Sequence, residues 1–520
     1  MKLVSKKIFL TIFIALAICC ATIFATRVWL TFSCKYAINL TEQVSSWASY
    51  QTAVGQPIYS QDYLKGPYAN IICYAPFYFW VVGSISKFVV WLSNWNTFHT
   101  TLIIGRIISI AAMTMLLLIL SRILQSAGVR RPYNYLPFLI VALVPQALRV
   151  CVQCTTDTLP IFFELALIYV ALTFSDKKII IPAIGFLGFA ALMTRLTSFV
   201  GLIIILVYAC FNHRERSKLL YGILLSVILF DLIFVLLLKT TGGACLYSMF
   251  FSQGKNPFLS SWRENIVTHA FSTHIFKISA LITVCAFFVT LLSVLLIRLK
   301  VPFEKLRNIF KFFIFEGPMR IILIYSFAWL VFAYFYSGKV WSGTNYFMPA
   351  IFGCAACIVF CFHKLFAMLP RKSTIPLACL LFLIAAKDVY GNIKPLKNHA
   401  DSVDYINTTK SRLAREIKNY KKVFTKQSDV LCSQGKTTYM VDPFTICMAQ
   451  KEGWFSASNI YEYVEKQYYD CVFVELHCLG DSPGYYWLPG LAFKVQKYYY
   501  RNIRIPIHFL FIRPKKLMAK

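Results

Sequence analysis

The sequence predicts an all-α polytopic membrane bundle of about 11–13 transmembrane helices with a small C-terminal α/β domain. Three observations lead to this fold class. The 520-residue chain is 58% hydrophobic, and its mean hydropathy of +0.62 is too high for a soluble globule. Apolar runs of about 20 residues, the length that crosses roughly 30 Å of hydrocarbon, recur along it. From about Asn392 onward Lys, Asp and Tyr become frequent and the elements become short.

The first apolar run extends from Ile8 to about Phe32 and follows three lysines. It is too long for a secretory signal and lacks a small-residue cleavage site, so we expect a retained anchor with a cytoplasmic N-terminus. Basic loops place residues 392–520 on the outer side, which requires an odd number of spans. The number of crossings is least defined over residues 68–124. Further candidate spans lie near 71–92, 101–123, 134–150, 158–174, 179–194, 197–211, 219–238, 276–297, 319–336, 346–368 and 374–390.

We therefore predict two parts. Residues 1–391 form a membrane module with an outward loop at 33–70, and residues 392–520 form a soluble α/β domain on the outer face. No catalytic constellation is recognisable in the second part, which favours a scaffolding or substrate-shaping role. Its patterns predict helices at 403–423, 456–467 and 488–500, and strands at 429–433, 471–475 and 507–512.

The formal net charge of +31 fits basic loops beside anionic lipid headgroups, and a basic outward cavity would favour an anionic substrate. No nucleic-acid-binding module is recognisable, so membrane lipids and not nucleic acid are the expected partners. The 17 cysteines are scattered, mostly within apolar runs, where they act as small hydrophobic residues. Neither they nor the unclustered histidines form a metal-binding set.

The segment 41–79 between the first two apolar runs is polar, aromatic and rich in turn residues. Glu42 lies just beyond the first run, and Gly55-x-Pro57-x-Tyr59 and Tyr74-x-Pro76-x-Tyr78 follow it. Gly and Pro favour tight turns, and Pro suits the first turn of a helix that re-enters the bilayer. A carboxylate at the end of a span beside such a loop is a candidate catalytic base at a membrane surface.

This arrangement resembles the first outward loop of the GT-C superfamily, integral membrane glycosyltransferases that use polyprenyl-phosphate sugars. Protein mannosyltransferases and the lipid A aminoarabinose transferase are members. Glu42 falls where the acid of that loop belongs, while Thr41 stands where many members have Asp. The resemblance also includes Tyr59 and Tyr74, which we predict to bind substrate.

The resemblance implies a function: transfer of a hexosyl or pentosyl group from a polyprenyl-phosphate-linked donor to a lipid, glycan or protein acceptor. It places the protein in a bacterial inner membrane, with the reaction at the outer face. Glu42 would take the proton of the acceptor hydroxyl, and direct displacement at C1 would invert the anomeric centre.

Two charged residues at the ends of candidate spans are further site predictions, because charges there are costly. Asp157 opens a span; it is either a helix N-terminal acid or a residue of the same cavity as Glu42. In the cavity it would orient the acceptor or help to hold a divalent cation. Arg195 separates two apolar runs, and either binds helix carbonyls or makes a bidentate contact with the donor phosphate.

The stretch 338–347 resembles the G-x-x-x-N-Y-F/L sequence near the end of the membrane part of these enzymes. It suggests that Asn345 and Tyr346 bind sugar hydroxyls and Lys339 the donor phosphate. The alternative is an interfacial anchor, since aromatic and Lys residues are common at that depth. For Arg106, Glu164 and Asp231, which lie within spans, we expect buried structural pairs.

A transporter or lipid flippase would also have many spans and intramembrane charges. Transporters often contain internal repeats, and none is detectable here. The acid-bearing outward loop and the soluble C-terminal part favour the transferase. A non-catalytic membrane scaffold that keeps the fold is a third alternative, because Asp is missing at position 41.

Overall fold

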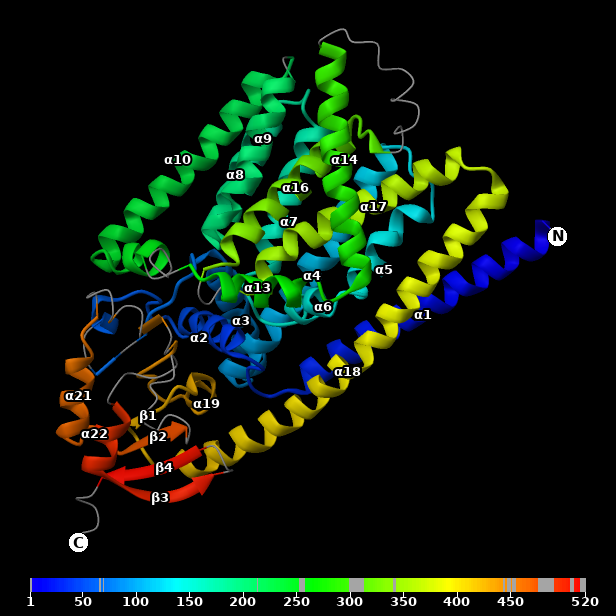
Figure 1. Cartoon of the computed structure of the whole chain (residues 1–520). Helices are drawn as coiled ribbons and strands as arrows, with labels where there is room; N and C mark the ends of the chain where they lie inside the picture. Colours follow the sequence, from blue (N-terminus) through cyan, green and yellow to red (C-terminus); the bar gives the residue numbers. More distant parts are fainter. Residues whose placement is uncertain are drawn as a thin grey trace.

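The computed structural model is a helical bundle joined to a small sheet-containing domain by one very long helix (Figure 1). It describes residues 2–64, 67–68, 70–212, 214–251, 258–298, 313–339, 343–442, 445–446, 450, 455–475, 491–505 and 509–514. The predicted fold class, a polytopic helical membrane bundle with a C-terminal α/β domain, is confirmed.

Among the described residues, seven helices are long and apolar enough to cross a membrane. They include or overlap α1 (Lys2–Ser33), α4 (Thr97–Ser126), α10 (Arg216–Thr241), α14 (His274–Arg298), α16 (Pro318–Tyr336), α17 (Met348–Met368) and α18 (Arg371–Ile417). Four shorter apolar segments lie among them: α3 (Phe77–Ser93), α7 (Thr158–Thr173), α8 (Ile180–Thr194) and η3–α9 (Leu196–Ser198, Phe199–Phe211).

The segment predicted to be a span at 134–150 is broken. The short helix η2 (Tyr133–Tyr135) leads into α5 (Leu136–Ala142), and α6 (Pro145–Cys151) follows at an angle of 88°. Such a bend is typical of a broken span or a re-entrant loop, and Pro145 at the start of α6 suits a new helix start. Within residues 68–124, where the number of crossings was least defined, helix α3 is shorter than the seven long helices, and Asn96 shortly after it donates to the backbone oxygen of Ser433 in the C-terminal domain at 3.1 Å.

The outward loop contains helix α2 (Leu40–Ala53), and Thr41 in its first turn lines the cavity described below. Asn39 caps it: its side-chain oxygen accepts a hydrogen bond from the backbone N–H of Glu42 at 2.9 Å. After the 3₁₀ helix η1 (Gln61–Leu64), α3 begins directly after Pro76, as predicted. Helix α2 packs on α3 and α4, so the loop is part of the bundle's core.

Helix α18 is continuous from Arg371 to Ile417, through the predicted boundary at residue 391. Its first part belongs to the bundle, and its last turns lie beside the C-terminal domain (Figure 1). No linker separates the two parts there, since one helix belongs to both.

The C-terminal domain has a four-stranded sheet in the order β1-β2-β4-β3. Strand β1 (Val423–Phe424) is parallel to β2 (Cys471–Glu475), which is antiparallel to β4 (Phe509–Pro514), and β4 is antiparallel to β3 (Tyr499–Ile505). Within the described residues, the strands predicted at 471–475 and 507–512 correspond to β2 and β4, and the helix predicted at 456–467 corresponds to α21 (Ala457–Glu465). The helix predicted at 488–500 is present as α22 (Leu491–Tyr498), but Tyr499 and Tyr500 already belong to β3, a strand that was not predicted. Residues 429–433, predicted as a strand, form helix α19 (Ser428–Ser433) instead.

The physical reason for this error is burial. Residues 428–432 are all buried, so the run lacks the alternation that distinguishes a half-exposed strand from a short buried helix. The domain also contacts the bundle: Ile71 of the outward loop and Tyr247 belong to the same buried cluster as the domain's Tyr469 and Phe424.

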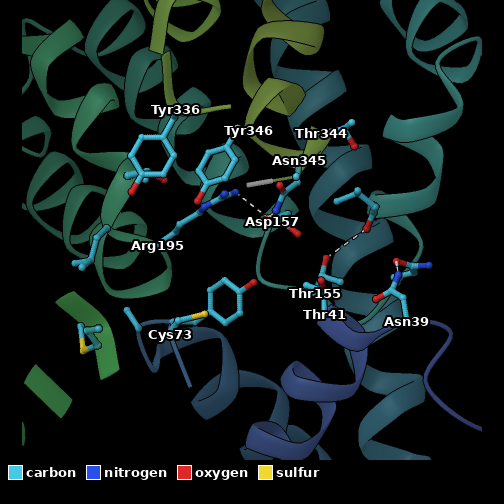
Figure 2. A pocket seen from close by; sticks show the side chains of 18 of the residues that line it. Asn39, Thr41, Cys73, Thr155, Asp157, Arg195, Tyr336, Thr344, Asn345 and Tyr346 are labelled. Carbon is cyan, nitrogen blue, oxygen red and sulfur yellow. Dashed lines mark hydrogen bonds and ion pairs between the residues drawn. The ribbon is translucent and has the colours of Figure 1, made fainter. Parts of the chain in front are cut away.

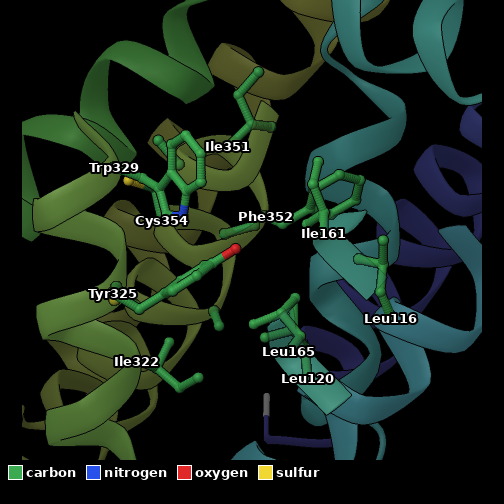
Figure 3. Close-up of a cluster of buried hydrophobic side chains, with 14 of the residues drawn as sticks. Leu116, Leu120, Ile161, Leu165, Ile322, Tyr325, Trp329, Ile351, Phe352 and Cys354 are labelled. Atoms are coloured by element: carbon green, nitrogen blue, oxygen red, sulfur yellow. The ribbon is translucent and has the colours of Figure 1, made fainter. Parts of the chain in front are cut away.

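The bundle core is formed by α4, α7, α16 and α17 (Figure 3). Within it the carboxylate of Glu164 accepts hydrogen bonds from the hydroxyl of Tyr325 and the indole N–H of Trp329, both at 2.9 Å. Glu164 thus has hydrogen-bonding partners, and the ion pair that we expected for it is not found among the described residues. Asp231 is exposed on α10 and makes no ion pair with a described residue.

Candidate active site

A cavity of about 270 Å³ lies where the outward loop meets the ends of several membrane helices. Its walls come from the start of α2, the segment before α3, α6 and the loop after it, the α8–η3 junction, and η6 (Thr344–Phe347). Segments from most of the first 350 residues therefore meet here. Met249 and Phe250 close one side; they belong to η4 (Tyr247–Phe251), which follows the short helix α11 (Ala244–Leu246). Residues 252–257, which follow η4, are outside the described part.

Asp157 and Arg195 form an ion pair in the cavity wall. The Nη1 atom of Arg195 lies 2.8 Å from Oδ1 of Asp157, and the two residues are 8% and 2% exposed. Asn345 Nδ2 donates to the same carboxylate oxygen at 2.8 Å. The guanidinium carbon of Arg195 lies 4.6 Å from the ring centroid of Tyr346, a cation–π contact (Figure 2). Four predicted site residues, from distant parts of the chain, are thus in contact.

The local sequence explains how these side chains reach one point. Helix α8 ends at Thr194, and Arg195 is extended (φ −153°, ψ 121°) before the next helical turn starts. Asp157 directly precedes α7 but makes no capping hydrogen bond. Its carboxylate is directed to Arg195 and Asn345, so it is not the simple helix N-terminal acid that the sequence left as an alternative.

Two predicted tyrosines have different positions. Tyr74 lines the cavity, whereas Tyr59 does not. The hydroxyl of Tyr59 is buried and donates to the backbone oxygen of Tyr74 at 2.5 Å. Tyr59 therefore fixes the backbone that carries Tyr74, and a direct contact with substrate would need a rearrangement of this loop.

Lys339 lies behind the cavity wall. It is 6% exposed, and its Nζ atom lies 3.4 Å from the hydroxyl of Tyr336 and 5.0 Å from that ring's centroid. Burial lowers the pKa of Lys339. Tyr336 itself lines the cavity and packs against Tyr346, with ring centroids 4.8 Å apart. Residues 340–342 of this loop are outside the described part.

Glu42 does not line the cavity, although Thr41 beside it does. It is fully buried and paired with Arg106 of α4, with Nε 2.9 Å from Oε1 and Nη2 3.2 Å from Oε2. The backbone N–H groups of Ile38 and Cys154 donate to the two carboxylate oxygens at 2.8 and 2.9 Å. Arg106 also donates to the backbone oxygens of Thr31, Cys34 and Tyr36.

This geometry does not fit the predicted role of Glu42 as general base. Burial opposes its ionisation, but the ion pair with Arg106 and the hydrogen bonds lower its pKa below the usual range. Each oxygen accepts two hydrogen bonds, so no lone-pair direction is left for a substrate proton. Arg106 forms the buried ion pair that we expected for it, and its partner is Glu42.

Gly105 of α4 allows the segment that contacts Glu42 to approach. A Cβ atom at Gly105 would lie 2.1 Å from the sulfur of Cys154, whose N–H holds Glu42. We expect Gly105→Ala to destabilise the protein by about 1–3 kcal/mol through overpacking, measured as a fall in the thermal unfolding temperature. Gly391→Ala on α18 is the control: nothing lies within 4 Å of that Cβ, and Ala favours a helix. Equal unfolding temperatures for the two variants would contradict this.

Sequence reasoning missed several cavity residues, among them Arg149, Gln153 and Tyr336. For Arg149 the available signal was a positive charge inside an apolar run, since residues 143–152 contain no other charged side chain. Gln153 and Tyr336 carry no comparable signal, because single amides and span-terminal tyrosines are common.

The cavity residues do not fit a divalent cation. Asp157 is the single carboxylate of the described lining, and its Oδ1 atom already accepts from Arg195 and Asn345. No group of three or more His, Cys, Asp or Glu side chains able to hold a metal occurs among the described residues. Hard cations require several oxygen ligands, so we derive no reaction step through a metal.

No family model matches the sequence, and no curated protein matches it. Solved structures do. ArnT from Cupriavidus metallidurans bound to undecaprenyl phosphate aligns over 95% of this chain and 97% of its own, with a TM-score of 0.59 at 11% identity. The archaeal oligosaccharyltransferase AglB from Archaeoglobus fulgidus, in complex with an inhibitory peptide and a dolichol-phosphate, aligns over 95% of this chain and 72% of its own. Its TM-score is 0.54 at 12% identity.

Both proteins are GT-C superfamily membrane glycosyltransferases. The likeness covers the membrane part and the C-terminal domain together, since it extends over nearly the whole chain. The resemblance predicted from the first outward loop is confirmed at the level of the fold: this chain has the fold of the GT-C membrane glycosyltransferases.

Proposed function

We propose that this protein transfers a sugar from a polyprenyl-phosphate-linked donor to an acceptor hydroxyl, in the cavity that contains Asp157 and Arg195. The observation that carries the proposal is that buried ion pair in the wall of a 270 Å³ cavity. In a glycosyl transfer, a carboxylate can remove the proton of the acceptor hydroxyl, and a neighbouring guanidinium can stabilise the phosphate that leaves. The shared fold supports it, as do the undecaprenyl phosphate and dolichol-phosphate bound by ArnT and AglB.

In the proposed reaction Asp157 replaces Glu42 as the general base. The acceptor oxygen attacks C1 of the sugar as Asp157 takes its proton, and the bond from C1 to the phosphate oxygen breaks with its electrons on the phosphate. The attack occurs opposite the leaving group, so the anomeric centre inverts. Arg195 uses one nitrogen for Asp157, and its other N–H groups stabilise the departing phosphate.

Asn345 and Tyr346 position these two groups. Asn345 Nδ2 holds Asp157, and its buried Oδ1 atom has no partner, so it can accept a hydrogen bond from a sugar hydroxyl. The ring of Tyr346 supports Arg195, and Tyr74 lines the same cavity. Lys339 influences the site through Tyr336, whose hydroxyl it contacts. Tyr59 does so through Tyr74, whose backbone oxygen accepts its hydrogen bond. We place the cavity at the outer membrane face, with residues 392–520 on that side and the N-terminus in the cytoplasm.

The test is a reconstituted assay that follows radiolabel from polyprenyl-phosphate sugars into candidate lipid, glycan or peptide acceptors. Arg195→Gln is expected to reduce transfer by about 100- to 1,000-fold, because the departing phosphate loses its cation. Arg214→Gln, whose side chain is 93% exposed, is the matched control. A protein that only moves the intact lipid-linked sugar across the vesicle membrane, with no labelled product, would contradict the proposal and support a flippase.

A further inference from the structure

A second and larger cavity lies at the other end of the bundle. It has a volume of about 640 Å³, against about 270 Å³ for the catalytic cavity, and we name it the distal cleft. Its walls come from the last turn of α7, from α9 and α14, and from the start of α16. Asp157 directly precedes α7 and Leu172 lies near the end of that helix, so about 20 Å of helix separates the two cavities at 1.5 Å per residue. The ends of α9 and α14 at this cleft point away from the C-terminal domain (Figure 1).

The distal cleft has an apolar floor and an apolar rim. Helix α16 packs on both α9 and α14, and its Ile321 and Leu323 form the floor together with Ile204 of α9, all three buried. On the rim, Phe211 of α9 is 62% exposed and Leu291 of α14 is 54% exposed. Exposed apolar side chains on the helices of a membrane bundle face hydrocarbon, so the cleft is open to the chains of the surrounding lipids.

Two polar side chains of the lining lie at helix ends. Asn212 ends α9, and Arg320 lies in the first turn of α16. The Nε atom of Arg320 lies 3.4 Å from the backbone oxygen of Phe315, and its other N–H groups make no hydrogen bond or ion pair within the described residues. No carboxylate of the described chain lines the cleft. The cleft therefore combines apolar walls with one cation that has N–H donors to spare.

The surface around the distal cleft is basic. The loops after α7 and α9 end at the cleft, and their cations are Lys177, Lys178, Arg214, Arg216 and Lys218. The carboxylates of these loops are Asp176 and Glu215, and Glu215 is already paired with Lys218 at 2.7 Å. Glu316, before α16, is exposed. A basic surface of this kind attracts anionic lipids.

We propose that the distal cleft binds an anionic phospholipid, with the lipid phosphate on Arg320 and an acyl chain on the apolar floor. Guanidinium N–H donors match phosphate oxygens, and basic clefts between membrane helices bind acidic lipid headgroups. The cleft fits both parts of an amphiphile, a charged head and an apolar chain. This lipid belongs to the leaflet opposite the catalytic cavity, so the site is independent of the proposed transfer reaction.

Arg320→Gln tests the headgroup contact. Full-length protein in detergent micelles is titrated with phosphatidylglycerol or phosphatidylcholine, and the bound lipid is measured by native mass spectrometry. The wild type is expected to prefer phosphatidylglycerol, and Arg320→Gln to weaken the binding of that lipid by about 10-fold. Arg214→Gln is the matched control, because it removes a charge at the same end from a side chain that is 93% exposed and outside the cleft. Equal losses in the two variants would mean that only the surface charge attracts the lipid, and would overturn the proposal.

Val207→Phe tests the contact with the acyl chain. Val207 of α9 lines the cleft, so a larger side chain is expected to displace the chain and weaken the binding of phosphatidylglycerol by about 10-fold. Ile203→Phe is the control, since Ile203 lies on the same helix, is exposed and does not line the cleft. Unchanged binding in Val207→Phe would overturn the proposal, as would displacement of the bound lipid by farnesyl phosphate and not by a second anionic phospholipid. If Val207→Phe unfolds early in lipid-free detergent, the comparison of Arg320→Gln with Arg214→Gln still decides.

Discussion

Asp157→Asn is expected to lower sugar transfer by about 100- to 10,000-fold, the usual contribution of a general base. An amide cannot take the proton of the acceptor hydroxyl. The side-chain oxygen of Asn can still accept from Arg195 and Asn345, which both donate to Oδ1 of Asp157, so the cavity wall keeps its hydrogen bonds. The measurement is the initial rate of label transfer in the reconstituted assay, with donor binding measured separately.

Asp62→Asn is the matched control. Asp62 lies in the same outward region, on η1, and is exposed, so its loss changes the charge but not the cavity. Donor affinity that stays near the wild-type value while the rate falls would identify a role in the reaction step. A rate within a few fold of the wild type for Asp157→Asn would exclude Asp157 as the base.

Glu42→Gln has the largest expected effect on stability, a loss of about 3–5 kcal/mol in the free energy of unfolding. It would leave Arg106, which is 0% exposed, without its counter-charge. Because the pKa of Glu42 is lowered in the folded state, this contribution is present above the carboxyl's unfolded pKa and is lost as pH falls through the folded pKa. Thermal unfolding of the full chain in detergent measures the loss.

The double variant Glu42→Gln, Arg106→Gln separates a structural role from a catalytic one. Removing both charges is expected to destabilise the protein less than removing Glu42 alone, because no unpaired charge then remains buried. Transfer should recover in parallel with stability. A Glu42→Gln variant that unfolds at the wild-type temperature but makes no product would show that Glu42 acts as the base after all.

Much of the fold could be predicted from local patterns, because a bilayer imposes a length and a composition on each helix. The membrane class, most helices and the composition change near residue 392 follow from this. The break between α5 and α6 could not be predicted, since a bent pair and a straight span of the same length have the same hydropathy. The continuity of α18 through Pro376 and Pro395 was also hidden, because proline usually interrupts a helix.

For the candidate site, the residue types were predictable but their pairing was not. An acid or an arginine at the end of an apolar run is costly, so Glu42, Asp157 and Arg195 are recognisable in the sequence alone. Which acid meets which arginine depends on how α2, α4, α7 and α8 pack, across sequence separations of 64 residues for Glu42–Arg106 and 38 for Asp157–Arg195.

The sequence by itself determined that this is a many-span membrane protein with a polar, acid-bearing loop after its first helix and with the motifs of a membrane glycosyltransferase. Only the tertiary structure decided that Glu42 is neutralised by Arg106 inside the bundle while Asp157 borders the cavity. The reason is physical: the cost of a charge depends on the groups that surround it in space, and one-dimensional patterns do not contain those neighbours.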